Sequence, residues 1–267
     1  MFPRQEIKAN ARAALSANYW PVVGYPFLLG VVLSAVLSTI FSIVMVLLIG
    51  SVGLTALSGS AVAVVGGVGF AIVLYIVVIV AVLLFSNVIY AGRNYFFYKF
   101  YSGDTASFGT FFEGFKNGQM WHVIGGMFLM TLYILLWTWL LVIPGSVLMG
   151  VGVAFYDNVG LMIALMLVGF VLYIAGLVFA FAKSYQYSMI PYLLIDRPDL
   201  TVSGCFDMTK QLTAGNKFNL FVLDLSFIGW GILSAFTCGI LSIFYVGPYF
   251  SLAKAGAYDY LKRTRMV

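Results

Sequence analysis

Two ionisable residues, Asp224 and Lys254, lie inside apolar stretches of the sequence, where a charge is costly and points to a site. Asp224 belongs to FVLDLSFIGW (221–230), and both residues are 15 positions from Gly239. If the two stretches form an antiparallel hairpin that turns there, both side chains lie at equal depth, and we expect an intramembrane ion pair. Two roles stay open. Asp224 locks the hairpin, through this pair or through a bond to Ser226, Asn219 or a neighbouring tyrosine, or it belongs to a proton relay or substrate-binding site.

Other residue types that support catalysis form no recognised pattern. His122 is the only histidine, and beside Trp121 it is typical of a residue near lipid headgroups. No serine lies in a GxSxG context, and GGVGF (66–70) lacks the Lys-Ser/Thr of a phosphate loop. Cys205 and Cys238 fall on opposite sides of the predicted membrane and make no metal site. We therefore expect no enzyme activity, no cofactor and no metal.

The composition identifies the solvent around these residues. Of 267 residues, 63% are hydrophobic and 9% charged, against about 45–50% and 25% in soluble domains. A helix needs about 20 apolar residues to cross a bilayer. Runs of this kind fall at about 21–49, 62–90, 123–143, 159–182, 218–237 and 240–261. The sequence thus predicts an all-α, polytopic integral membrane protein with six transmembrane helices.

The basic residues predict the orientation. All 14 lysines and arginines lie before the first run, between the second and third, between the fourth and fifth, or towards the chain end. The opposite loops, near 50–61, 154–159 and 237–240, contain none. By the positive-inside rule both termini are cytoplasmic. The net charge of +5 is therefore an orientation signal, and we expect the lipid bilayer, not nucleic acid, as the partner.

One pattern occurs three times. NYWPVVGYPFLL, QMWHVIGGMFLM and NKFNLFVLDLSF open the odd-numbered runs at spacings of 101 and 97 residues. We predict three parallel-repeated hairpins, each preceded by an amphipathic interfacial helix, in a single membrane domain (1–267) with pseudo-repeats at about 1–104, 105–199 and 200–267. The apolar stripes of the three interfacial helices are Ile7, Ala11 and Leu15; Phe108, Phe111, Phe112 and Phe115; and Cys205, Met208 and Leu212.

Small residues recur every four positions in the first run, where they predict a packing seam against another helix. They are Gly30, Ser34, Ser38 and Ser42. A polar conduction path along the same serines is the less favoured interpretation, because no charges face them.

Two prolines, Pro144 and Pro191, predict helix breaks that close a bend or line a cavity. The first two hairpins also have legs of about 36 residues, or roughly 54 Å, against a hydrocarbon core of about 30 Å. Trp137, about 24 Å beyond Trp121, and Trp139 are expected at the outer interface. Residues 143–157 would then bend along the outer surface and offer a docking surface.

Several segments resemble one family. They are RQEIKANARAALSANYW, FGTFFEGFKNG, WLLVIPG, IPYLLIDRPDLT, GNKFNLFVLDLSFIGW and VGPYFSLAKAGAYDYL. Together they are similar to the bacterial multi-pass proteins catalogued as domain of unknown function 975. The resemblance implies a six-helix protein of the inner (cytoplasmic) membrane with no established activity. A related likeness to the membrane domain of glycerophosphodiester phosphodiesterases implies a role near lipids.

Two function classes follow. The first is a non-enzymatic protein that interacts with or transports a lipid or amphiphile at a site near the broken helices. The second is a membrane scaffold or accessory subunit of another envelope protein complex, as a partner protein or a homo-oligomer. Polar ion or sugar transport is disfavoured, because the runs contain almost no inward-facing ionisable residue besides Asp224.

Overall fold

The computed structural model describes residues 2–57 and 61–265, and within these ranges the chain forms helices and no strand. The helices, in chain order, are α1 (Arg4–Ala17), α2 (Tyr19–Leu57), α3 (Ala61–Tyr101), the 3-10 helix η1 (Phe108–Gly118), α4 (Met120–Ala154), α5 (Val159–Tyr187), α6 (Ile190–Asp196), α7 (Val202–Thr213), α8 (Lys217–Leu225), α9 (Ile228–Phe236), the π-helix η2 (Ser242–Val246) and α10 (Gly247–Arg265). The prediction of an all-helical chain is confirmed.

Five segments are long and apolar enough to cross a membrane. They are Tyr19–Gly53, Val65–Tyr101, Met120–Ala154, Val159–Asp196 and Lys217–Phe236. The predicted sixth span, 240–261, is not among them; it holds η2 and most of α10, which carries Lys254 and Asp259. The structure thus supports a membrane protein with transmembrane helices, whereas the sixth span stays a prediction.

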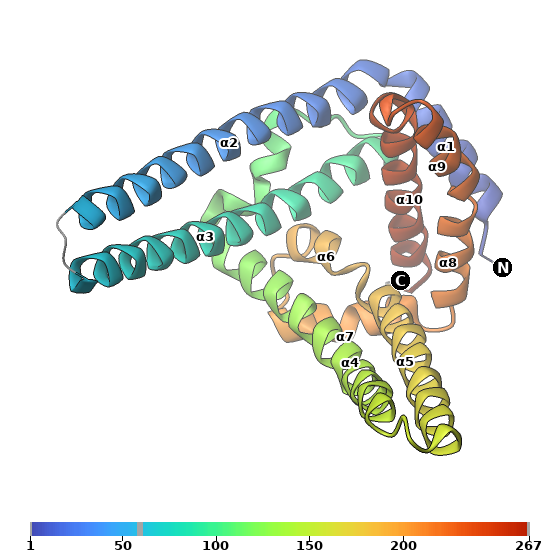
Figure 1. The fold of residues 1–267 in the computed structure, drawn as a ribbon. Helices are drawn as coiled ribbons and strands as arrows, with labels where there is room; N and C mark the ends of the chain where they lie inside the picture. Colours follow the sequence, from blue (N-terminus) through green and yellow to red (C-terminus); the bar gives the residue numbers. More distant parts are fainter. Residues whose placement is uncertain (1, 58–60, 266–267) are drawn as a thin grey trace.

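The buried core lies at one end of the molecule. It combines α1, η1, α6, α7, α8 and α10 with the adjoining ends of α2, α3, α4 and α5, and we call this assembly the base. Two long hairpins, α2–α3 and α4–α5, leave the base in different directions (Figure 1). Beyond the base their apolar side chains are mostly exposed, as expected for surfaces that face lipid.

Two of the predicted interfacial helices form α-helices in the base. In α1 the buried residues are Ile7, Ala11 and Leu15, the predicted stripe. Helix α7 spans Val202–Thr213, the predicted range, and buries Cys205 and Leu212. Thr201 caps its first turn, since the hydroxyl accepts a hydrogen bond from the Gly204 N–H at 3.1 Å.

The second interfacial segment is a 3-10 helix and not an α-helix. Residues three apart are eclipsed in this geometry, so Phe108, Phe111 and Gly114 share one side. Phe111 is fully buried and stacks on Phe96, with ring centroids 4.5 Å apart. Its backbone lies so close to Gly92 that a Cβ at that position would collide with the Phe111 carbonyl. Phe111 therefore anchors η1 against the base, with Phe108 and Phe115 half-buried, whereas Phe112 of the predicted stripe is exposed.

Part of the surplus length of helix α4 packs in the base. The Lys183 ammonium lies 4.4 Å from the Trp137 ring centroid, and the neighbouring Tyr133 ring contacts Phe206 of α7 at 5.3 Å. Trp137 thus lies level with α7, so the prediction that it marks the outer interface is wrong. Residues 138–154 then extend about 26 Å, close to the hydrocarbon thickness of roughly 30 Å.

The third hairpin is shorter and less regular. Helices α8 and α9 are separated at Ser226–Phe227, and the chain turns at Thr237–Gly239. Cys238 and Gly239 have positive φ angles of 49° and 82°, a conformation that suits Gly239 but strains Cys238. The turn lies at the predicted position, which brings α10 back alongside α8.

Candidate functional site

Asp224 of α8 and Lys254 of α10 form an ion pair. The Lys254 Nζ lies 2.6 Å from the Asp224 Oδ2, and the two side chains are 21% and 22% exposed. The Tyr185 hydroxyl of α5 donates a hydrogen bond to the same carboxylate oxygen at 2.7 Å. The other oxygen, Oδ1, is buried and has no partner in the described part of the chain. The pair therefore joins the third hairpin to α5.

The aromatic surroundings also stabilise the ammonium group. The Lys254 Nζ lies 5.2 Å from the Tyr185 ring centroid and 5.5 Å from that of Phe250, within the range of cation–π attraction. The ammonium has three donors, and Asp224 uses one of them. Lys254 can therefore keep its ion pair and still donate to another group.

A second polar cluster ties α10 to α6 and α3. The Asp196 Oδ2 accepts hydrogen bonds from the Tyr258 hydroxyl and the Lys262 Nζ, both at 2.6 Å. Lys262 also donates to the Tyr98 hydroxyl at 3.2 Å. Burial acts to lower the pKa of Lys262, but the bonds to Asp196 and Tyr98 outweigh it and the pKa is raised. Each polar group here has a partner, so the cluster is structural.

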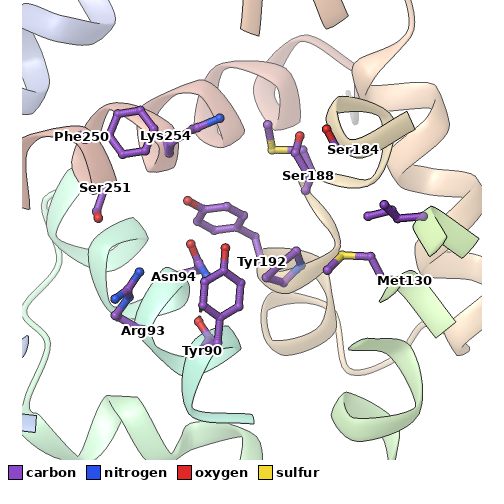
Figure 2. Close-up of a pocket in the computed structure, with 13 residues that line it drawn as sticks. Tyr90, Arg93, Asn94, Met130, Ser184, Ser188, Tyr192, Phe250, Ser251 and Lys254 are labelled. Carbon is purple, nitrogen blue, oxygen red and sulfur yellow. Dashed lines mark hydrogen bonds between the residues drawn. The ribbon is translucent and has the colours of Figure 1, made fainter. Parts of the chain in front are cut away.

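A pocket of about 260 Å³ lies where the inner ends of both long hairpins meet α6 and α10. We call it the basic pocket. Its polar lining includes Tyr90, Arg93, Asn94, Tyr192, Ser251 and Lys254. Figure 2 shows Arg93, Asn94 and Tyr90 of α3 reaching the same space as Tyr192 of α6, with Ser251 and Lys254 of α10 along its border. Met130, Ile134 and Phe250 complete part of the wall with apolar groups.

Of the two cations in the basic pocket, one has a carboxylate partner and the other does not. Lys254 is neutralised by Asp224, which does not line the pocket. Arg93 forms no ion pair with a carboxylate of residues 2–57 or 61–265, and its guanidinium carbon lies 5.6 Å from the Tyr90 ring centroid. The pocket therefore carries about one uncompensated positive charge.

The two predicted helix breaks differ. Pro191 lies in the first turn of α6, after the chain leaves α5 at Ser188, and it lines the basic pocket. Pro144 does not break its helix: α4 continues through it to Ala154, so the predicted bend of 143–157 is wrong. The neighbouring Gly145 packs closely on Tyr173 and Gly169 of α5, so α4 stays against α5 on both sides of the proline.

The predicted packing seam does not contact another helix of the described chain. Gly30, Ser34, Ser38 and Ser42 are all exposed, and a Cβ on Gly30 would meet no described atom within 4 Å. The three hydroxyls donate to carbonyls of their own helix, at 2.8–2.9 Å. The seam within the chain lies instead between α4 and α5, where glycines meet. The outward stripe stays a prediction of contact with another molecule.

Sequence reasoning missed Arg93, Tyr185 and Tyr192 as site residues. Arg93 lies three residues beyond the apolar run 62–90, and this position by itself indicates only the orientation of the chain in the membrane. The Nε2 of His122 is buried without a partner in the described residues. No group of three or more His, Cys, Asp and Glu residues that could hold a metal occurs among them either.

The fold and the site define a class: a helical membrane protein whose base encloses a basic pocket between two apolar hairpins. A family model described as "Protein of unknown function (DUF975)" matches residues 1–265, so the chain belongs to this family. The comparisons with curated proteins and with solved structures find no match. The relation to glycerophosphodiester phosphodiesterases therefore stays a prediction.

Proposed function

We propose that this protein is a non-enzymatic membrane protein that binds or transports an amphiphile, with the polar part in the basic pocket and the apolar part along the neighbouring hairpin helices. One observation carries the proposal: a pocket with charged, amide and hydroxyl groups lies between helices of membrane length. Ligand sites of helical proteins commonly lie between helices.

The dimensions support a headgroup-sized ligand part. Drug-sized ligands occupy roughly 300–1,000 Å³, whereas the basic pocket measures about 260 Å³. It therefore has room for a small polar group and not for acyl chains. Arg93 lies three residues beyond the apolar run 62–90 of α3, so an apolar tail that leaves the pocket would lie against lipid-facing helices.

Protection of a single thiol in the pocket tests the proposal. Ser251→Cys, in a Cys238→Ser background, places a thiol in the lining. The native Cys205 is buried, and burial raises its pKa to about 11, so it stays unreactive near neutral pH. We expect added lipid extract to slow maleimide labelling at position 251. Ser107→Cys, on an exposed loop, is the control that lipid should not slow. Equal rates at position 251 with and without lipid would refute the proposal.

The proposed orientation places the base on the cytoplasmic side of the inner membrane, with six spans and both termini inside. The complete segregation of the 14 basic residues supports this arrangement. Cys238 is exposed at the turn of the third hairpin. A membrane-impermeant maleimide should therefore label it from outside intact cells. Labelling only after the membrane is opened would contradict the six-span topology.

A membrane scaffold or accessory subunit is the second candidate function. The outward stripe of Gly30, Ser34, Ser38 and Ser42 favours it, because small residues let a partner helix approach closely. A polypeptide that co-purifies stoichiometrically with the natural chain and is lost on Gly30→Leu would support this function over the first.

A further inference from the structure

We propose that the basic pocket selects an anionic headgroup, with a phosphate oxygen set held by Arg93 and Lys254. This inference rests on the proposed function and adds the chemical class of the ligand. The two cations line one pocket from different helices, α3 and α10. Figure 2 shows Arg93 on one side of the Tyr192 ring and Lys254 on the other, so an anion beside this ring has a cation on either side.

Charge balance gives the first argument. The lining contains two basic side chains and no carboxylate, and only Lys254 has an acidic partner. The Arg93 guanidinium is exposed at the border of the pocket, so it is free to pair with an anion that enters, and the apolar surroundings of α3 strengthen that attraction. A zwitterionic or neutral headgroup would attract this cation less.

Hydrogen-bond geometry gives the second argument. A guanidinium is a planar fork of donors that matches two oxygens of one phosphate. Lys254 keeps donors free beyond the one that Asp224 uses. The hydroxyls of Tyr90, Tyr192 and Ser251 donate to no other described residue and also line the pocket. Phosphate oxygens are strong acceptors, so these donors fit an anion better than a cationic ligand.

The volume of the pocket indicates which part of the ligand it can hold. A volume of about 260 Å³ accommodates a phosphate with a small substituent, while the apolar tails lie outside. Free phosphate shares this chemistry, so the experiment must separate a lipid headgroup from a free anion. We favour the headgroup, because the pocket adjoins membrane-length helices.

The test uses the thiol introduced by Ser251→Cys in the full-length protein. Protection is titrated in nanodiscs with phosphatidic acid or phosphatidylglycerol and, separately, with phosphatidylcholine of the same acyl chains. We expect the anionic lipids to protect at about tenfold lower content, the size of one charge-assisted interaction. Adding Arg93→Gln should remove this preference, and Arg93→Lys should retain part of it.

Arg12→Gln is the matched control. Arg12 is also an exposed arginine over a tyrosine ring, 5.8 Å from the Tyr249 centroid, but it does not line the basic pocket. It should leave the lipid preference unchanged. Equal protection by phosphatidylcholine, or an unchanged preference in Arg93→Gln, would overturn the anionic selection while amphiphile binding stands. No protection by any lipid would instead refute the proposed function. Protection by inorganic phosphate alone would assign the pocket to a free anion and overturn the headgroup.

Discussion

The two long hairpins are joined by different contacts along their length. In α4–α5, Gly145 and Gly169 approach so closely that an added Cβ on either would lie within 3 Å of the other helix's backbone. Gly152 and Gly176 make similar contacts with the facing helix. In α2–α3, the glycines Gly30, Gly50, Gly66 and Gly69 meet no described atom at their Cβ positions. The helices of the α4–α5 hairpin therefore pack closely through glycines, whereas those of the α2–α3 hairpin pack loosely.

The difference shows how helices associate in lipid. Lipid tails are as apolar as leucine, so burying apolar side chains drives helix pairing little there, and close backbone approach supplies the attraction. Small residues are therefore necessary for a tight pair but not sufficient. Gly30 and the serines of α2 have the right spacing, yet they face away from α3.

The attachment of the hairpins to the base differs too. Helix α5 is held by Tyr185 at the Asp224–Lys254 pair. The α2–α3 hairpin is attached through other contacts: the Tyr19 hydroxyl donates to the Phe244 carbonyl at 3.2 Å, and on α3 the Tyr98 hydroxyl accepts a hydrogen bond from Lys262. Both hairpins are therefore attached to the base, and they differ mainly beyond it, where α4–α5 is closely packed and α2–α3 is not.

Breaking the Asp224–Lys254 ion pair should have the largest effect on the stability of the protein. Asp224→Asn leaves Lys254 without its counter-charge, and we expect a loss of about 2–3 kcal/mol in stability, below the roughly 3–5 kcal/mol of a fully buried pair. Adding Lys254→Gln should recover part of it. Thermal unfolding in detergent measures both. Asp207→Asn removes the exposed pair with Lys210 and should cost no more than about 0.5 kcal/mol. A similar loss of stability in Asp224→Asn and Asp207→Asn would show that the Asp224–Lys254 pair contributes no more than an exposed ion pair.

Disturbing the glycine contact between α4 and α5 should have the next largest effect on stability. Gly145→Ala places a methyl group against the α5 backbone, and overpacking of this kind costs about 1–3 kcal/mol. Gly30→Ala adds the same methyl group in open space and should be neutral or slightly stabilising, because alanine favours the helix. The same unfolding assay compares the two variants. Equal destabilisation would contradict the difference between the hairpins.

Several elements were predictable because their signals are local. The stripe of α1, the range of α7 and the turn at Cys238–Gly239 follow from residue spacing and from the need of apolar runs to reverse. The Asp224–Lys254 contact was predictable for a related reason: residues equidistant from a hairpin turn lie at equal depth. The contribution of Tyr185 was not, because α5 is distant in sequence.

Other predictions failed because they depended on which helix packs against α4. The distance from Trp121 predicts Trp137 at the outer interface, but Trp137 lies beside α7 and Lys183, because the first turns of α4 pack in the base. Pro144 predicts a break in α4, but the helix continues through it and Gly145 packs closely on α5. In both cases the local signal does not say how α4 packs against its neighbours.

The sequence by itself determined the apolar, membrane-type character of the chain, most of its helices and its family, because apolar composition and amphipathic spacing act through each segment alone. Only the tertiary structure decided which glycines form the seam and which residues share the basic pocket. The physical reason is that every face of an apolar helix is acceptable to lipid. The chain's own periodicity therefore cannot say which face meets a neighbour. Arg93, Tyr192 and Lys254 come together only when α3, α6 and α10 pack.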